Sequence, residues 1–229
     1  MNAEPVTIAV HGAQSVSGLL LRPRSPVACY VMAHGAGAGM RHASMATCAE
    51  ELAQLDVATL RFQFPYMERG SKRTDPPATC HGTVRAAVSV ARDLCPAVPL
   101  LAGGRSFGGR MTSQAQALDP LPGVLGLVFL GFPLHPPGKP SVDRAAHLAG
   151  VGVPMLFLQG TRDDLASLDL MQGVVTALGP RATLYLLQEA DHSFHVTARS
   201  GRNDTDVRRE MLHAFRDWSA TIVASARPD

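Results

Sequence analysis

Short apolar runs alternate along the chain with segments whose apolar positions recur every three or four residues. A continuous apolar run between turn residues is typical of a strand buried on both faces, whereas the three-to-four spacing is typical of a helix with one face on a core. This alternation predicts an α/β protein with a mostly parallel sheet flanked by helices. The predicted parallel strands are 27–32, 57–62, 100–102, 124–130, 155–158 and 183–187.

Two shorter apolar segments, 6–10 and 17–21, precede this alternation and surround His11-Gly12. They predict an antiparallel hairpin at the edge of the sheet, which brings the total to about eight strands. The predicted helices are 45–55, 84–91, 111–118, 168–178 and a last amphipathic segment with Val207, Met211, Phe215, Trp218 and Ile222 on one face.

The chain has 229 residues, of which 46% are hydrophobic and 17% charged, and neither a linker nor an internal repeat interrupts it. One domain over residues 1–229 is therefore expected. The net charge is +2 and the basic residues are scattered, so no nucleic-acid partner is expected. The N-terminus lacks the pattern of a secretion signal, and no apolar run approaches the ~18 residues that span a bilayer. We therefore expect a cytoplasmic protein without a membrane partner.

Four cysteines, Cys29, Cys48, Cys80 and Cys95, show no C-x-x-C spacing. Two of them lie in apolar-periodic segments, where a free cysteine behaves as a small hydrophobic residue. None lies in a glycine-flanked turn, where a nucleophile would be expected. The sequence indicates no metal site and no cofactor.

The segment Gly104-Arg105-Ser106-Phe107-Gly108 has the G-x-S-x-G pattern between a predicted strand and a predicted helix. In this pattern a tight turn exposes the serine, and small flanking residues let strand and helix pack closely. A phosphate loop is the alternative, but no Gly-Lys-Ser/Thr follows the glycines. Ser106 is therefore predicted to be a nucleophile.

A serine hydroxyl needs a base and an orienting carboxylate, and both residue types follow later strand ends in the order Ser, Asp, His. Asp163 follows the strand 155–158, and His192 follows the strand 183–187. Asp163 is preferred to Asp164, which would instead cap the next helix, because it is nearer to the strand. His192 is preferred to His195 for the same reason. The predicted catalytic residues are Ser106, Asp163 and His192.

Acyl transfer also needs N–H donors for the oxyanion, one from the residue after the nucleophile and one from the loop after an earlier strand. These positions are Phe107 and Ala36. Ala36 lies in the glycine-rich segment 34–39, which directly follows the strand 27–32. A dinucleotide loop is the alternative for this segment, but its glycines are spaced two apart and do not match G-x-G-x-x-G.

With these residues placed, the chain resembles the small lidless α/β-hydrolases related to dienelactone hydrolases and carboxylesterases. Within them it is most similar to a branch of bacterial predicted hydrolases related to the third regulatory subunit of the histone-acetyltransferase complex NSL. The resemblance covers nearly the whole chain and rests on the segments AHGAGAGM (33–40), RFQFPYME (61–68), GRSFGGRM (104–111), PLHPPGKP (133–140), QGTRD (159–163) and ADHSF (190–194).

The chain departs from these relatives at two places. Dienelactone hydrolases use a cysteine nucleophile where this chain has Ser106, so their lactone activity does not carry over. The run Asp-Asp-Leu-Ala at 163–166 replaces an expected Asp-x-x-Gly, which leaves the acid assignment open. The resemblance implies an α/β-hydrolase fold without a lid domain and a Ser-His-Asp mechanism.

Hydrolysis of a small-molecule carboxylic ester or thioester is the leading functional hypothesis. A non-catalytic interaction module with the same fold and a small peptidase are the alternatives. The loops 64–77 and 132–140 are expected to form the walls of an open site. The candidate substrate contacts, for which loop packing is the alternative role, are Arg41, His42, Tyr66, Arg105 and His135.

Overall fold

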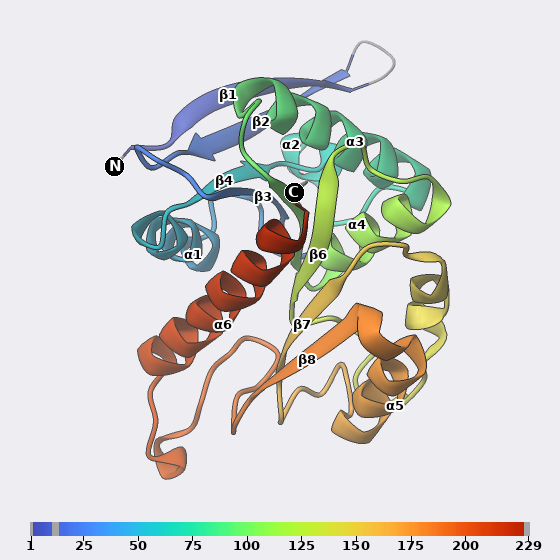
Figure 1. The fold of residues 1–229 in the computed structure, drawn as a ribbon. Helices are drawn as coiled ribbons and strands as arrows, with labels where there is room; N and C mark the ends of the chain where they lie inside the picture. The colour runs from blue at the N-terminus through green and yellow to red at the C-terminus, as the bar shows by residue number, and fades with distance from the viewer. Residues whose placement is uncertain (1, 11–13, 227–229) are drawn as a thin grey trace.

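The structure is a computed structural model that describes residues 2–10 and 14–226. In this part of the chain, eight strands form one sheet in the order β1-β2-β4-β3-β5-β6-β7-β8 (Figure 1). The predicted hairpin pairs β1 with β2, and its turn at His11-Gly12 lies outside the described residues. The strands are β1 (Glu4–Val10), β2 (Gln14–Leu21), β3 (Ala28–Ala33), β4 (Val57–Phe62), β5 (Leu100–Arg105), β6 (Val124–Leu130), β7 (Met155–Gly160) and β8 (Ala182–Leu187).

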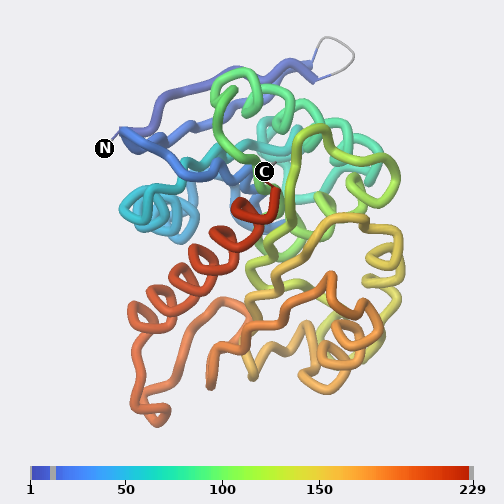
Figure 2. The backbone as a smooth tube through the Cα atoms, viewed as in Figure 1, coloured from blue at the N-terminus to red at the C-terminus, as the bar shows by residue number. Residues whose placement is uncertain are grey.

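Strands β3 to β8 are parallel, whereas β2 pairs antiparallel with both β1 and β4. The predicted mostly parallel sheet is therefore confirmed. Figure 2 shows the chain passing from the N-terminal hairpin at one edge of this sheet to β8 at the other. All parallel strands end at one edge, so the loops that follow them meet there.

Helices cover both faces of the sheet. One face packs against α1 and α6, and the other packs against α3, α4 and α5 (Figure 1). Every residue of β3, β4 and β7 is buried, because these strands have helices above and below, and this explains their continuous apolar runs. The helices are α1 (Ala43–Gln54), α2 (Pro65–Glu68), α3 (Pro77–Leu94), α4 (Phe107–Leu118), α5 (Leu168–Leu178) and α6 (Asp204–Ser225), with 3-10 helices η1 (Asp143–Gly150), η2 (Gly179–Arg181) and η3 (Ala198–Ser200).

Several strands are longer than predicted, most of all β2 and β5. Strand β2 begins at Gln14, and β5 continues through two glycines to Arg105. A Cβ atom on Gly103 would lie 1.9 Å from the carbonyl oxygen of Val128, so only glycine fits this close approach between strands. The predicted wall loop 64–77 contains a short helix, α2, whereas 132–140 contains none. Pro65 begins α2, in keeping with the fixed φ that suits proline to a first helical turn.

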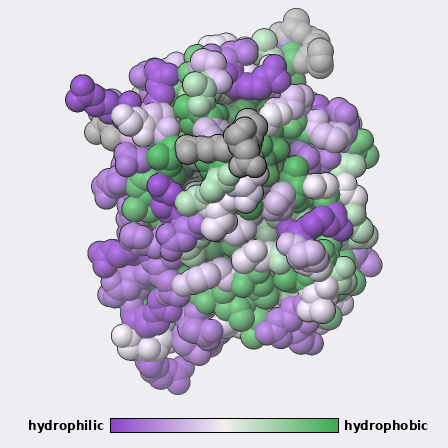
Figure 3. Space-filling view, in the orientation of Figure 1, coloured by the Kyte–Doolittle hydropathy of each residue, from purple (hydrophilic) through white to green (hydrophobic). Residues whose placement is uncertain are grey.

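The segment from Gly131 to Pro154, between β6 and β7, contains only the short helix η1. No lid domain is inserted there. Among the described residues, no helix is both long and apolar enough to cross a membrane. Figure 3 shows hydrophilic residues gathered over the N-terminal part of α6, which begins with Asp204 and is rich in charged side chains.

Candidate active site

Ser106 occupies the turn between β5 and α4, with φ 50° and ψ −115°. A positive φ is rare for a residue with a side chain and costs about 1–3 kcal/mol, so the surrounding structure must enforce it. Close packing provides that constraint. A Cβ atom on Gly104 would lie 2.2 Å from the carbonyl oxygen of Ala33, and one on Gly108 would lie 2.5 Å from that of His34. The glycines of the pattern therefore let β5 and α4 press against the end of β3.

The three predicted catalytic side chains form one hydrogen-bonded chain at the carboxyl edge of the sheet. The Ser106 hydroxyl lies 2.8 Å from Nε2 of His192. On the other side of the ring, Nδ1 of His192 lies 2.7 Å from a carboxylate oxygen of Asp163. With the proton on Nδ1, His192 donates to Asp163 and accepts from Ser106. This tautomer leaves Nε2 able to take the serine proton.

Asp163 is buried and lies next to three donors. One carboxylate oxygen accepts from the N–H of Leu165 at 2.8 Å, and the other accepts from both His192 and the side-chain amide of Gln159. Asp164 is exposed, and it is not the cap of the next helix, since Ser167 is the N-cap of α5. The structure therefore brings Asp163 to His192, and the proposed capping role of Asp164 is wrong. Sequence reasoning missed Gln159, for which the only signal was its place in the QGTRD segment.

The loop that carries His192 is shaped by local hydrogen bonds. The carboxylate of Asp191 accepts from the N–H groups of Ser193 and His195 at 2.7 and 2.9 Å. His195 points to Asp204 at 2.9 Å, so it fastens the loop to α6 and does not reach the serine. The hydrogen bond to Asp204 raises the pKa of His195 above its ordinary value.

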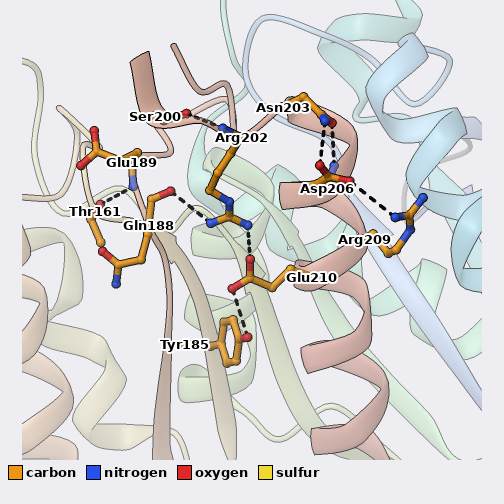
Figure 4. Close-up of polar contacts among 10 residues, drawn as sticks. All are labelled: Thr161, Tyr185, Gln188, Glu189, Ser200, Arg202, Asn203, Asp206, Arg209 and Glu210. Carbon is orange, nitrogen blue, oxygen red and sulfur yellow. Dashed lines mark hydrogen bonds and ion pairs between the residues drawn. The ribbon is translucent and has the colours of Figure 1, made fainter. Parts of the chain in front are cut away.

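A polar network holds the segment that follows this loop (Figure 4). Arg202 forms an ion pair with Glu210 of α6, and its guanidinium also donates to the carbonyl oxygen of Gln188 at 3.3 Å. Glu210 in turn accepts from the hydroxyl of Tyr185 in β8 at 3.2 Å. Asn203 caps α6 by accepting from the N–H of Asp206 at 3.0 Å. These contacts tie α6 to the end of β8, from which His192 is presented.

The glycine-rich loop after β3 is held by two buried side chains. Nε2 of His34 accepts from the N–H of Phe64 at 3.0 Å, and its Nδ1 donates to the carbonyl oxygen of Gly35 at 2.7 Å. Burial lowers the pKa of His34, which keeps the ring neutral as this pair of bonds requires. The Tyr66 hydroxyl donates to the carbonyl oxygen of Ala36 at 2.9 Å. Ala36 is exposed on this fixed loop.

Phe107 is the first residue of α4, so its N–H has no acceptor within the helix. Its half-buried ring packs edge-on against Phe64, with centroids 5.6 Å apart, and against Tyr66 at 6.4 Å. The same aromatic group that holds the Ala36 loop therefore fixes the residue after Ser106.

The five predicted substrate contacts have different surroundings. Tyr66 is fully buried on the Ala36 loop, and His135 is 2% exposed with Nε2 accepting from the N–H of Ser167 at 3.1 Å. Burial removes both from any surface that a substrate reaches, so for them the alternative role of loop packing is the correct one. His42 is exposed and caps α1. Arg41 is exposed beside it, and Arg105 is half-buried with its guanidinium 5.8 Å from the ring of Phe194.

In the described part of the chain, the cysteines form no disulfide and the acidic residues form no metal site. All four cysteines are buried free thiols. In the same residues, no group of three or more His, Cys, Asp or Glu side chains has an arrangement that would hold a metal ion.

Solved structures with the same fold include several hydrolases. An α/β serine hydrolase without a lid from Xanthomonas campestris matches with a TM-score of 0.74 and 19% identity, over 95% of each chain. A serine hydrolase homologue from Coxiella burnetii has a TM-score of 0.75 and 18% identity, covering 93% of this chain and 98% of the other. A dienelactone hydrolase from Anabaena variabilis has a TM-score of 0.75 and 20% identity, covering 93% and 95%.

The profile of the alpha/beta hydrolase domain family matches residues 26–220, which is most of the chain. This match agrees with the eight-stranded sheet and with the absence of an inserted lid domain between β6 and β7. The predicted family and fold are therefore confirmed: the chain belongs to the alpha/beta hydrolase domain family and is a small member without a lid.

Proposed function

We propose that this hydrolase is a serine esterase or thioesterase that works by acyl transfer. The observation that carries the proposal is the chain of two short hydrogen bonds, 2.8 Å from Ser106 to His192 and 2.7 Å from His192 to Asp163. A hydroxyl, an imidazole and a buried carboxylate in this order form an activated nucleophile.

The reaction follows from the positions of these groups. His192 takes the proton of Ser106 as the hydroxyl oxygen attacks the carbonyl carbon of the ester. Asp163 stabilises the imidazolium that forms. The N–H groups of Ala36 and Phe107 would bind the oxyanion of the tetrahedral intermediate. His192 then gives its proton to the departing alcohol or thiol, which leaves the acyl group on Ser106. Water attacks this acyl-enzyme while His192 takes a proton from it, and His192 returns that proton to Ser106 as the acid is released.

Esters and thioesters suit this site because His192 supplies the one proton that an alcohol or thiol needs to leave, and no lid domain is inserted between β6 and β7. Among the proteins of the same fold, one is a dienelactone hydrolase, whose name gives a cyclic ester as its substrate. Another is an esterase domain from Rhodothermus marinus, with a TM-score of 0.73, 17% identity and coverage of 97% of this chain and 100% of that one. Both names support an ester as the substrate class.

The test is hydrolysis of p-nitrophenyl acetate by the wild type and by Ser106→Ala. We expect the substitution to lower turnover by roughly 10³-fold or more, as loss of a triad member does. Ser225→Ala, at the far end of α6, is the matched control and should keep full turnover. A fluorophosphonate probe should label the wild type and Ser225→Ala but not Ser106→Ala.

Two outcomes would contradict the proposal. Equal turnover or labelling of Ser106→Ala and wild type would refute the nucleophile. A folded wild-type protein that neither reacts with the probe nor hydrolyses any ester would favour the non-catalytic interaction module.

A further inference from the structure

Two arginines, Arg110 and Arg144, lie on helices α4 and η1, which pack together, and α4 begins directly after the nucleophile. The hydroxyl of Ser113 in α4 lies 2.7 Å from Nε2 of His147 in η1, which fixes how these helices meet. Arg110 precedes Ser113 by three residues, and Arg144 precedes His147 by three. A step of three residues keeps a side chain on the same side of an α-helix or a 3-10 helix. Arg110 and Arg144 therefore lie on the facing sides, one turn nearer to the carboxyl edge of the sheet.

Neither arginine has an anionic partner. Within residues 2–10 and 14–226, the side chains of Arg110 and Arg144 form no hydrogen bond and no ion pair, and Nε of Arg110 is buried without an acceptor. Burial lowers the pKa of Arg110, and the charge of Arg144 lowers it further. Burial, followed by the charge of Arg110, lowers the pKa of His147 to about 4, so this histidine is neutral at pH 7. The positive charges of Arg110 and Arg144 therefore lie near each other where α4 meets η1, with no negative charge between them in the described part of the chain.

The neighbouring helix α3 does not neutralise them. Asp75, just before α3, is already bound by the guanidinium of Arg69 and by the N–H of Tyr66 at 2.7 Å. Burial raises the pKa of the Cys80 thiol to about 12, so Cys80 carries no charge at neutral pH. Burial also lowers the pKa of His81. An unbalanced pair of guanidinium groups is the pattern of a site that receives its anion from a ligand.

The pair lies close to the reacting atoms. The N–H of Arg110 donates to the carbonyl oxygen of Ser106 at 3.1 Å, so Arg110 is one helical turn beyond the nucleophile. Its guanidinium lies 5.8 Å from the centre of the ring of Phe107, whose N–H is the proposed oxyanion donor. Arg110 therefore lies beside the residue that follows the nucleophile, and Arg144 lies near Arg110 on η1.

We propose that Arg110 and Arg144 form a subsite for a carboxylate or phosphate group of the ester substrate. Planar guanidinium groups bind either anion through paired N–H donors, here the terminal N–H groups of the two side chains. The subsite rests on the proposed esterase function and narrows it: the preferred substrates are esters or thioesters that carry a negative charge.

The kinetic test compares 4-nitrophenyl hydrogen adipate with its neutral methyl ester, which have the same chain length and leaving group. For the wild type, kcat/KM should be roughly tenfold or more higher for the anionic ester, and Arg110→Met and Arg144→Met should each remove most of this preference. Arg92→Met, in the last turn of α3, removes the same charge from an exposed position and should keep the preference. A wild type that prefers the neutral ester, or variants with an unchanged ratio, would overturn the subsite.

Direct binding separates this proposal from the esterase function. Adipate or inorganic phosphate should raise the melting temperature of the wild type and of Ser106→Ala, but not that of Arg144→Met. A shift with adipate alone assigns the subsite to carboxylates, and one with phosphate alone assigns it to phosphates. Arg110→Lys, which keeps the charge in the more buried position, should keep part of the shift. Absence of any shift in the wild type would overturn the subsite even if ester hydrolysis is found.

Discussion

Replacing Gly108 by alanine adds one methyl group where the backbone leaves no room for it. Gly108 lies in the first turn of α4 and is not among the glycines with a positive φ, so its backbone suits alanine. A Cβ atom there would nevertheless lie 2.5 Å from the carbonyl oxygen of His34 and 2.6 Å from that of Ala33. Both oxygens belong to the backbone at the end of β3, which cannot rotate away as a flexible side chain can.

The expected loss of stability is the cost of overpacking less a small gain in helix propensity. Overpacking costs about 1–3 kcal/mol, and alanine in place of a helical glycine gains about 0.5–1 kcal/mol. In a chain of this size each kcal/mol shifts the melting temperature by roughly 2–4 °C, so we expect a decrease of several degrees. The larger effect falls on catalysis, because the strained contact moves α4 relative to the Ala36 loop. A displacement of about 1 Å between such groups costs about 10²-fold in rate.

The assay is turnover of p-nitrophenyl acetate together with thermal unfolding followed by circular dichroism. Gly173→Ala is the matched control, since Gly173 is also helical and a Cβ atom on it would meet nothing within 4 Å. This control should raise the melting temperature slightly and leave turnover unchanged. If Gly108→Ala keeps wild-type turnover and melts no lower than Gly173→Ala, the reasoning from close packing at the turn is refuted.

Three further changes test the site and its support. Asp163→Asn should lower turnover roughly 10⁴-fold, whereas Asp164→Asn should leave it unchanged; similar losses in both would contradict the assignment of the acid. Tyr66→Phe leaves the carbonyl of Ala36 without its buried donor, so urea unfolding should show a free energy of unfolding lower by about 1–3 kcal/mol. The substitution should lower kcat more than it changes KM, and an effect on KM alone would indicate that Tyr66 contacts the substrate. The pKa of His147 is lowered from 6.5 to about 4 by burial, so the unfolded chain binds its proton first and stability is lost as the pH falls through this range. Urea unfolding at pH 7 and at pH 5 measures this loss. The free energy of unfolding should decrease less between pH 7 and pH 5 for His147→Gln than for the wild type, and equal decreases would argue against a neutral buried ring.

The sequence by itself determined the order of elements and the residues at the strand ends. Helices cover both faces of the sheet, so its central strands are apolar on both sides and stand out as continuous runs. Parallel strands end at one edge, so Ser106, Asp163 and His192 were predictable as neighbours although 29 and 86 residues separate the bonded pairs. The glycines around Ser106 marked the turn because no larger residue fits it.

Only the tertiary structure decided what each polar loop residue contacts. Tyr66, His135 and Arg41 all lie in segments that follow strand ends, so the sequence predicted each of them equally as a substrate contact. Packing nevertheless buries Tyr66 and His135 and leaves Arg41 exposed. No sequence pattern links Arg110 with Arg144, and they become neighbours only because α4 and η1 pack side by side. The physical reason is that strand and helix patterns repeat along the chain, whereas the burial and partners of a loop side chain depend on segments that lie far away in sequence.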